Sequence, residues 1–252
     1  MRKVWLLRLL FVAAAIGVWQ ALSGPLVDPY FISSPSRIAS DLYDGFIEGT
    51  LARDVGATML EAGIGLVIGM ATGLVAGLLF AFLPLVDRVL EPFIGALNAI
   101  PRPALAPLFV LWFGLGMTSK VFVAWSLVFF VAFYNAYQGV KSIDQDVVNA
   151  VRVMRAGRRQ MLRIVILPAV FSWVFAAFKL SVGYALIGAI VGEFVGSTSG
   201  LGYQLTKAQG LLDTDRVFSI VVVTGVLAGV VLYLAALAES RLLKWRPQVN
   251  FG

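Results

Sequence analysis

Six long stretches with few or no charged residues constrain this chain more than any other feature of its sequence. They cover residues 6–24, 60–84, 92–116, 120–140, 164–194 and 217–239. Each can form a helix that crosses a bilayer, which takes about 20 residues at a rise of about 1.5 Å per residue. Because 60% of the residues are hydrophobic and 13% are charged, one soluble core could not bury this much apolar surface. The sequence predicts an all-α polytopic membrane protein with six transmembrane helices in a single domain, residues 1–252.

The distribution of positive charge indicates how these spans are oriented. With the N-terminus inside, most of the 20 Lys and Arg residues lie on the inner side. The outer side keeps Arg37, Arg53, Lys120, Lys207 and Arg216. The positive-inside rule then predicts a multi-pass protein of a bacterial-type inner membrane with both termini in the cytoplasm. The first segment also fits a cleaved signal peptide, because a basic start precedes its apolar run.

Several classes of chemistry are excluded by composition. The chain has neither Cys nor His, so it offers no thiol nucleophile, no imidazole base and no usual zinc site. It also lacks the G-x-x-x-x-G-K-[ST] pattern that cradles nucleotide phosphates. We therefore expect a non-catalytic chain that binds no metal or cofactor. The basic excess follows membrane topology, so no nucleic-acid partner is expected.

A ladder of glycines runs through the second predicted span at intervals of four residues. It consists of Gly65, Gly69, Gly73 and Gly77. Such a ladder leaves a smooth groove on one helix face, where a second helix can approach closely. The groove can serve packing inside the bundle or an interface between subunits.

The predicted inner loop, residues 141–163, has a pattern of its own. Ser142 and Gln145 have the spacing of a capping box. Apolar residues then recur at helical spacing, at Val147, Ala150, Val151 and Met154. The pattern predicts a short helix with one apolar face, followed by a break and a basic segment. Two interpretations remain open, a helix lying on anionic lipid headgroups and a helix that docks onto a protein partner.

The same loop resembles the EAA loop of ABC importer permeases. In that loop Glu-Ala-Ala is followed by Gly and then by Ile-x-Leu-Pro at fixed spacing. The matching residues here read Asn149-Ala150-Val151, then Arg155, then Val165-x-Leu167-Pro168. Arg155 stands where the family has the Gly that turns the chain, and Gly157 is expected to provide the turn instead.

Two further segments extend this resemblance over nearly the whole chain. They are Ile100 to Lys120 and Ala189 to Leu205, which are similar to permeases of the nitrate, sulfonate, taurine and thiamine-precursor import group. The resemblance implies a type I ABC importer permease fold. It also implies two cytoplasmic ATPase subunits that use ATP and Mg, an extracytoplasmic substrate-binding protein and a second permease copy. A homodimer is the simplest assembly, and a heterodimer stays open.

The resemblance and the residue types together nominate functional residues. Those of the ATPase-coupling loop are Asn149, Ala150, Val151, Arg152, Met154, Arg155, Ala156, Gly157 and Arg158. Those of the substrate pathway are Lys179, Arg102, Glu193, Tyr134 and Tyr184. Charges inside a span usually face a cavity or a partner, and the aromatic rings could meet a flat solute. Each pathway residue could instead serve packing or a structural ion pair.

The expected function is that of a permease subunit that carries a small organic solute or anion and is driven by a separate ATPase. The resemblance slightly favours thiamine-precursor-like heterocycles over nitrate, sulfonate or taurine. A secondary transporter or channel is the alternative, since it too needs broken helices and charges inside the membrane. A membrane enzyme is disfavoured by the absence of His and Cys.

Overall fold

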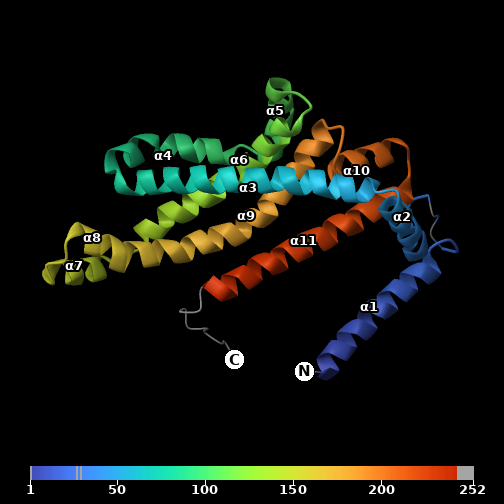
Figure 1. Cartoon of the computed structure of the whole chain (residues 1–252), viewed down its shortest axis with the longest axis horizontal. Helices are drawn as coiled ribbons and strands as arrows, with labels where there is room; N and C mark the ends of the chain where they lie inside the picture. Colours follow the sequence, from blue (N-terminus) through green and yellow to red (C-terminus); the bar gives the residue numbers. More distant parts are fainter. Residues whose placement is uncertain (1, 27, 29, 243–252) are drawn as a thin grey trace.

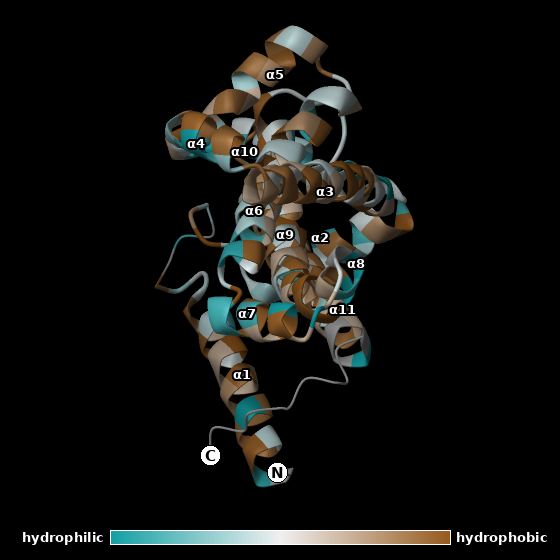
Figure 2. Ribbon diagram, turned by 90° about the vertical axis from the view of Figure 1, so that its left-hand side faces the viewer, coloured by the Kyte–Doolittle hydropathy of each residue, from teal (hydrophilic) through white to brown (hydrophobic). Residues whose placement is uncertain are grey.

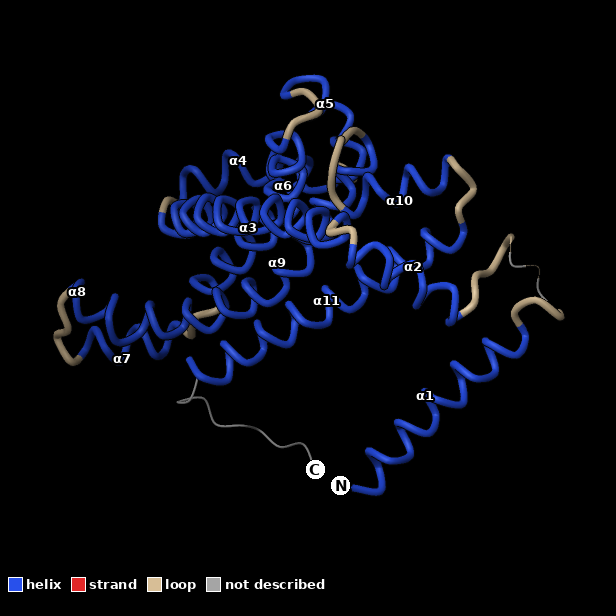
Figure 3. The backbone as a smooth tube through the Cα atoms, turned by 45° about the vertical axis from the view of Figure 1, so that its right-hand side comes forward, coloured by secondary structure: helices blue, strands red, loops and turns tan. Residues whose placement is uncertain are grey.

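The computed structural model describes residues 2–26, 28 and 30–242, and it consists of helices joined by short turns (Figures 1 and 3). Its elements are α1 (Arg2–Leu22), α2 (Pro35–Ile47), α3 (Thr50–Phe82), α4 (Pro84–Ala99), η1 (Arg102–Leu105), α5 (Ala106–Phe113), α6 (Met117–Lys141), α7 (Gln145–Val153), α8 (Arg158–Met161), η2 (Leu162–Ile166), α9 (Leu167–Val195), α10 (Leu201–Gly210) and α11 (Thr214–Leu242).

Five of the described helical stretches are long and apolar enough to cross a membrane, or six if one bent pair counts as a span. They are α1, α3, α6, α11 and the continuous run from α8 through η2 to α9. The prediction of an all-α polytopic protein is thus confirmed. The third predicted span, however, is not one straight helix, because α4 and the segment Arg102–Phe113 meet at 86°. Ile100 and Pro101 are extended at this bend, and Ile100 directly precedes a proline, which favours this conformation.

The glycine ladder of α3 packs inside the bundle. A Cβ built on Gly69 would lie 2.7 Å from the Cβ of Val128, and one built on Gly73 would lie 2.8 Å from the Cβ of Ala132. Both contacts belong to α6, so the backbones of α3 and α6 approach as closely as glycine permits. The ladder therefore serves packing within this chain.

The glycines of α9 and those of α11 differ in whether another helix packs closely against them. Gly188 and Gly192 of α9 face Ala124 and Lys120 of α6, so α6 lies between α3 and α9. A Cβ built on Gly225 or Gly229 of α11, in contrast, would meet none of the described atoms within 4 Å. The face of α11 that carries these glycines is left open by the part of the chain that the structure describes.

Helix α1 stands apart from the bundle (Figure 1). Its last turn is held by described residues, since Trp19 Nε1 donates a 2.9 Å hydrogen bond to the carbonyl of Ser33 and the ring lies 6.1 Å from that of Phe218. Hydrophobic residues follow most of its length (Figure 2), and none of its apolar span is buried. A partner or lipid must cover α1, because the described residues of this chain do not.

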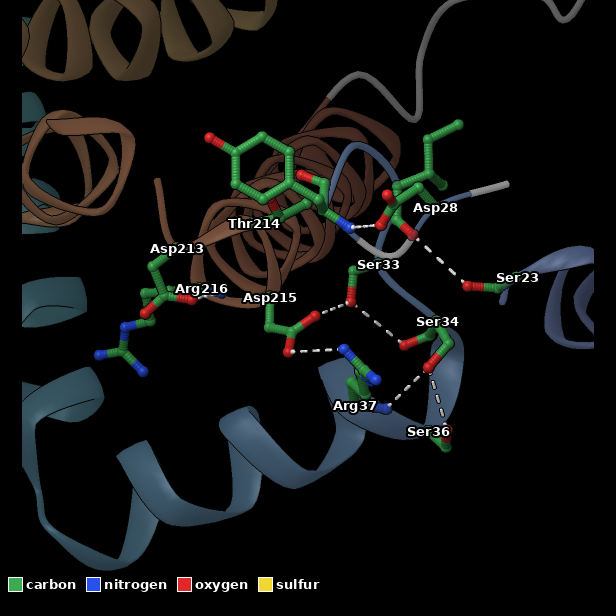
Figure 4. A network of polar contacts seen from close by, with 12 residues as sticks. Ser23, Asp28, Ser33, Ser34, Ser36, Arg37, Asp213, Thr214, Asp215 and Arg216 are labelled. Carbon is green, nitrogen blue, oxygen red and sulfur yellow. Dashed lines mark hydrogen bonds and ion pairs between the residues drawn. The ribbon is translucent and has the colours of Figure 1, made fainter. Parts of the chain in front are cut away.

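Polar contacts fasten the connection before α2 to the start of α11 (Figure 4). Ser33 Oγ donates to Asp215 Oδ1 at 2.6 Å, and Thr214 Oγ1 donates to the carbonyl of Tyr30 at 2.6 Å. The hydroxyl of Ser34 caps α2 by accepting from the backbone N–H of Arg37. These contacts fix α2 and the start of α11 at the α10 end of the molecule, opposite α7 (Figure 1).

Candidate functional site

Helix α7 begins two residues later than its capping-box pattern predicts. Asp144 is the N-cap, and its carboxylate accepts the backbone N–H of Asp146 at 2.8 Å. Ser142 instead ends α6, where its own N–H donates to the carbonyl of Gln138. The prediction of Ser142 as N-cap is therefore wrong. An ionised carboxylate caps a helix start at least as well as a hydroxyl, and it also meets the positive end of the helix dipole.

No residue of α7 is buried, although all nine are described. The apolar side chains that end the helix are the most exposed, with Val153 at 83% and Met154 at 80%, and Val147 is exposed at 47%. Asn149, Ala150 and Arg152 are exposed as well, and Val151 is half-buried. Figure 3 shows α7 and α8 projecting beyond the other helices. The apolar face thus has no partner among the described residues of this chain, which is unfavourable in water.

The turn after α7 is built by Arg155, and the prediction that Gly157 provides it is wrong. Arg155 adopts a left-handed φ of 57°. Its N–H donates to the carbonyl of Arg152 at 2.9 Å, and the N–H of Ala156 donates to that of Val151 at 3.3 Å. This pair of bonds is the Schellman motif, which usually has glycine at the left-handed position. A side chain there costs roughly 1 kcal/mol.

Gly157 serves the next helix. Its N–H donates to Oε1 of Gln160 at 3.0 Å, and its carbonyl accepts the N–H of Met161 at 3.0 Å. A side chain that reaches back from the third helical residue to the N-cap is one half of a capping box. Arg158 follows in α8, and its side chain lies outside the described part of the chain. Two capped helices therefore meet at one defined elbow.

The five predicted pathway residues lie in three separate places. Arg102 and Tyr134 are close together, since both pack against the ring of Phe130. Lys179 and Tyr184 are exposed on α9. Glu193 lies near the end of α9 and is 1% exposed. The structure does not gather them into one cavity.

Arg102 occupies the bend between α4 and α5. The side chain is buried, with 9% of the residue exposed. Its guanidinium lies 3.9 Å from the centroid of the Phe130 ring, and Nη2 donates to Oδ1 of Asn98 at 3.3 Å. The cation thus sits on an aromatic face, an arrangement that is favourable where water is scarce.

Glu193 holds the loop between α9 and α10. Its carboxylate accepts the hydroxyl of Thr58 at 2.7 Å and the N–H of Gly202 at 2.6 Å. Thr58 in turn accepts the N–H of Leu201 at 2.9 Å. Gly200 has a left-handed φ of +101°, and a Cβ there would run into the Glu193 carboxylate. The loop therefore folds directly over a buried carboxylate.

Asp54 extends this network at the start of α3. Its two carboxylate oxygens accept the N–H of Gly200 at 2.8 Å and the side-chain amide of Gln204 at 2.6 Å. Asp54, Thr58, Glu61 and Glu193 are all buried. The outer network, as we call Asp54, Thr58, Glu61, Glu193 and Gln204, ties α3 to α9 and α10.

Sequence analysis missed the outer network apart from Glu193. Asp54, Thr58 and Glu61 recur at helical spacing on one face, in the first turns of a largely apolar helix, and this polar stripe was the available signal. Lys120, predicted on the outer side of the membrane, is 0% exposed. Its Nζ donates to the carbonyls of Leu115 and Gly116, which end the chain segment just before α6. The interior thus satisfies this cation with backbone oxygens.

Comparisons with known proteins agree on one family. Residues 46–244 match the family described as binding-protein-dependent transport system inner membrane component. The putative aliphatic sulfonates transport permease protein SsuC of Bacillus subtilis is 30% identical over 97% of this chain and 89% of its own length. The formylaminopyrimidine transport permease protein ThiX of Halalkalibacterium halodurans is 32% identical over 95% of each chain. The taurine transport system permease protein TauC of Escherichia coli is 29% identical over 92% of this chain and 86% of its own.

Solved structures show the same fold. An inward-facing structure of the MetNI methionine ABC transporter has a TM-score of 0.64 at 18% identity, covering 77% of this chain and 95% of its own. A bacterial ABC transporter that imports alginate has a TM-score of 0.65 at 14% identity, covering 96% and 97%. The alternatives of a secondary transporter, a channel or a membrane enzyme lose their basis. The chain belongs to the family of binding-protein-dependent transport system inner membrane components, and it is a non-catalytic, multi-pass inner-membrane permease subunit of an ABC importer whose ATPase is a separate subunit.

Proposed function

We propose that the coupling elbow, defined as α7, the Arg155 turn and α8, is the surface on which the separate ATPase docks. The observation that carries the proposal is the unburied apolar face of α7, with Met154 80% exposed. A helix that presents apolar anchors at helical spacing fits a groove on a partner protein. The residues predicted for coupling, from Asn149 to Arg158, all lie on this elbow.

The elbow is connected to the bundle in a way that can transmit force. The helical run from Arg159 to Val195 is continuous over 37 residues, so α8 passes into α9 without a break. α9 packs along α6 through Gly188 and Gly192. When the ATPase dimer closes on ATP, displacement of the elbow moves α9 against α6, and the pathway alternates between its two sides.

The elbow lies on the cytoplasmic side in this proposal. The basic residues Arg152, Arg155, Arg158, Arg159 and Arg163 gather there, as the positive-inside rule expects. The start of α1 and the end of α11 point toward the α7 side in Figure 1, which supports cytoplasmic termini. The outer network then lies on the extracytoplasmic side, where the substrate-binding protein delivers its solute.

A second copy of this chain completes the pathway. Two surfaces support it: the length of α1 that the described residues leave uncovered, and the face of α11 at Gly225 and Gly229, which these residues also leave open. Glycine-lined faces permit close helix contact in membranes. A homodimer with two ATPase subunits, which use ATP and Mg, needs no further permease. The mass of the purified complex distinguishes it from a heterodimer.

The transported substrate is a small organic solute or anion. Relatives of similar identity are named for sulfonates, taurine and a formylaminopyrimidine, so the comparisons favour neither an anion nor a heterocycle. Arg102 and Tyr134 are the pathway residues that the fold brings together. Lys179 and Tyr184 face outward from α9, where a second copy or lipid covers them, and Glu193 shapes the extracytoplasmic end.

The docking proposal is tested by a charge placed on the apolar face of α7. In Met154→Glu, a carboxylate replaces an apolar anchor, and we expect copurification of the ATPase and transport-coupled ATP hydrolysis to fall by about tenfold or more. Gln145→Glu is the matched control. A helix turns about 100° per residue, so Gln145 lies on the opposite face of α7 from Met154. Equal copurification and coupling in both variants would remove the basis of the proposal.

A further inference from the structure

Arg102 lies level with the middle of the membrane-spanning helix α6, so we place it at mid-membrane depth. Its guanidinium rests on the ring of Phe130, which is midway along the 25-residue helix α6. A charge at this depth is costly unless it faces a cavity or a partner. The chain is also broken here by an 86° bend, and broken helices commonly form the binding sites of transporters near the bilayer midplane. Burial, depth and broken backbone thus coincide at one residue.

The guanidinium uses few of its hydrogen-bond donors. It has five N–H groups, and only the bond from Nη2 to Asn98 is made to a described residue. None of the ion pairs among described residues includes Arg102. Lys120, the other buried cation, donates to two backbone carbonyls. The fold therefore satisfies one of its buried cations internally and leaves the other with donors to spare.

Two further polar groups stand beside these donors. The amide of Asn98 accepts from Arg102 through Oδ1, and its own N–H groups have no acceptor among the described residues. Tyr134 packs against Phe130 at a ring-centroid distance of 6.5 Å, one turn further along α6. A planar guanidinium beside an amide, with a tyrosine packed on the same phenylalanine ring, matches the oxygens of a sulfonate, a carboxylate or a phosphate.

We propose that Arg102, with Asn98 and Tyr134, forms a site inside the pathway that receives an anionic oxygen group of the transported solute. The inference rests on the proposed function, and it adds that the solute carries such a group. The Phe130 ring holds the guanidinium from one side, with its centroid 3.9 Å from Cζ of Arg102. A neutral heterocycle would leave this cation without compensation during passage.

The test uses the purified complex of the permease with its ATPase subunits in nanodiscs. Ethanesulfonate, inorganic sulfate and ethanol are titrated separately, and binding is followed by tryptophan fluorescence. We expect ethanesulfonate to bind and ethanol not to bind. Arg102→Gln should weaken ethanesulfonate binding by about tenfold or more, because it removes a charge-assisted hydrogen bond. Arg102→Lys keeps the positive charge, so its affinity for ethanesulfonate should fall by less.

Arg53→Gln is the matched control, since Arg53 is an exposed arginine at the start of α3, and it should bind ethanesulfonate as the unaltered chain does. Equal binding by Arg102→Gln and the unaltered chain, or no binding by the unaltered chain, would overturn the proposal. Binding of sulfate without ethanesulfonate would also overturn it, since this indicates an adventitious ion only. Copurification of the ATPase is scored in parallel. If the ATPase copurifies with none of the samples, including the unaltered chain, the docking proposal has failed and the anion-site proposal has not been contradicted.

Discussion

The two ends of the molecule differ in which side chains they bury and which they expose. At the α10 end, charged and polar side chains are buried and bonded to one another, as in the bond from Thr58 to Glu193 at 2.7 Å. At the α7 end, apolar side chains such as Met154 lie in the open. The first end is complete within this chain, apart from one oxygen of Glu61 that has no partner among the described residues. The second presents apolar side chains that no described residue covers.

This difference shows where the chain needs rigidity and where it needs association. A buried, bonded carboxylate gives one defined arrangement, because any displacement leaves a polar group unsatisfied. An exposed apolar face gains free energy only when another surface covers it. In the proposed mechanism, the outer network serves as the fixed end of the bundle, and the elbow is the end through which motion enters.

The largest expected effect is at Glu193. Glu193→Ala leaves the hydroxyl of Thr58 and the N–H of Gly202 without their acceptor. It also removes a carboxylate from the neighbourhood of Lys120, which packs against Gly192. We expect a loss of about 3 kcal/mol in the free energy of unfolding, measured by denaturant titration in micelles. Glu48→Ala, an exposed carboxylate on the same side, is the control. Equal losses in the two variants would show that the network is not what fixes this end.

The next effect concerns the packing that connects both ends. Gly69→Ala places a Cβ 2.7 Å from the Cβ of Val128, so α3 and α6 must move apart. We expect a loss of about 1–3 kcal/mol in the free energy of unfolding. Gly63→Ala meets nothing within 4 Å among the described atoms and should gain up to about 1 kcal/mol from helix propensity. If both substitutions act alike, α3 and α6 do not pack along the ladder.

The smallest expected effects concern two contacts made by the carboxylate of Asp215 (Figure 4). Ser33→Ala removes a 2.6 Å hydrogen bond to Asp215, and we expect a loss of about 1–2 kcal/mol in the free energy of unfolding. Arg37→Gln removes an ion pair of 3.9 Å whose side chains are 55% and 35% exposed. Its loss should be at most about 0.5 kcal/mol, because water screens the pair. The reverse order would contradict this division between bonded and screened contacts.

The all-α class and five of the six predicted spans could be predicted from the sequence, because they follow from hydrophobic length alone. The bend at Arg102 was foreseeable only in part. Pro101 and Pro103 predict broken backbone, whereas the 86° angle depends on packing against α6. The burial of Lys120 could not be predicted, because it depends on carbonyls that the turn at Gly116 brings to its side chain.

In the elbow as well, the local sequence pattern predicts the helix but not how the helix begins and ends. Apolar spacing correctly predicts a helix, since Val147 and Met154 mark the face of α7. The choice between Ser142 and Asp144 as N-cap is decided by where α6 ends, which a local pattern does not contain. Arg155 takes the left-handed turn because the Schellman bonds outweigh its modest strain, although residue preference favours Gly157.

Hydrogen exchange at the elbow tests the central claim most directly. The permease is placed in neutral-lipid nanodiscs, and amide exchange is compared with and without the ATPase subunits and in discs of anionic lipid. The account predicts slower exchange from Gln145 to Gly157 when the ATPase is present, with α2 at the other end unchanged. An amide exchange rate at α7 that is the same with and without the ATPase subunits, or that slows equally in anionic lipid without them, would contradict the account.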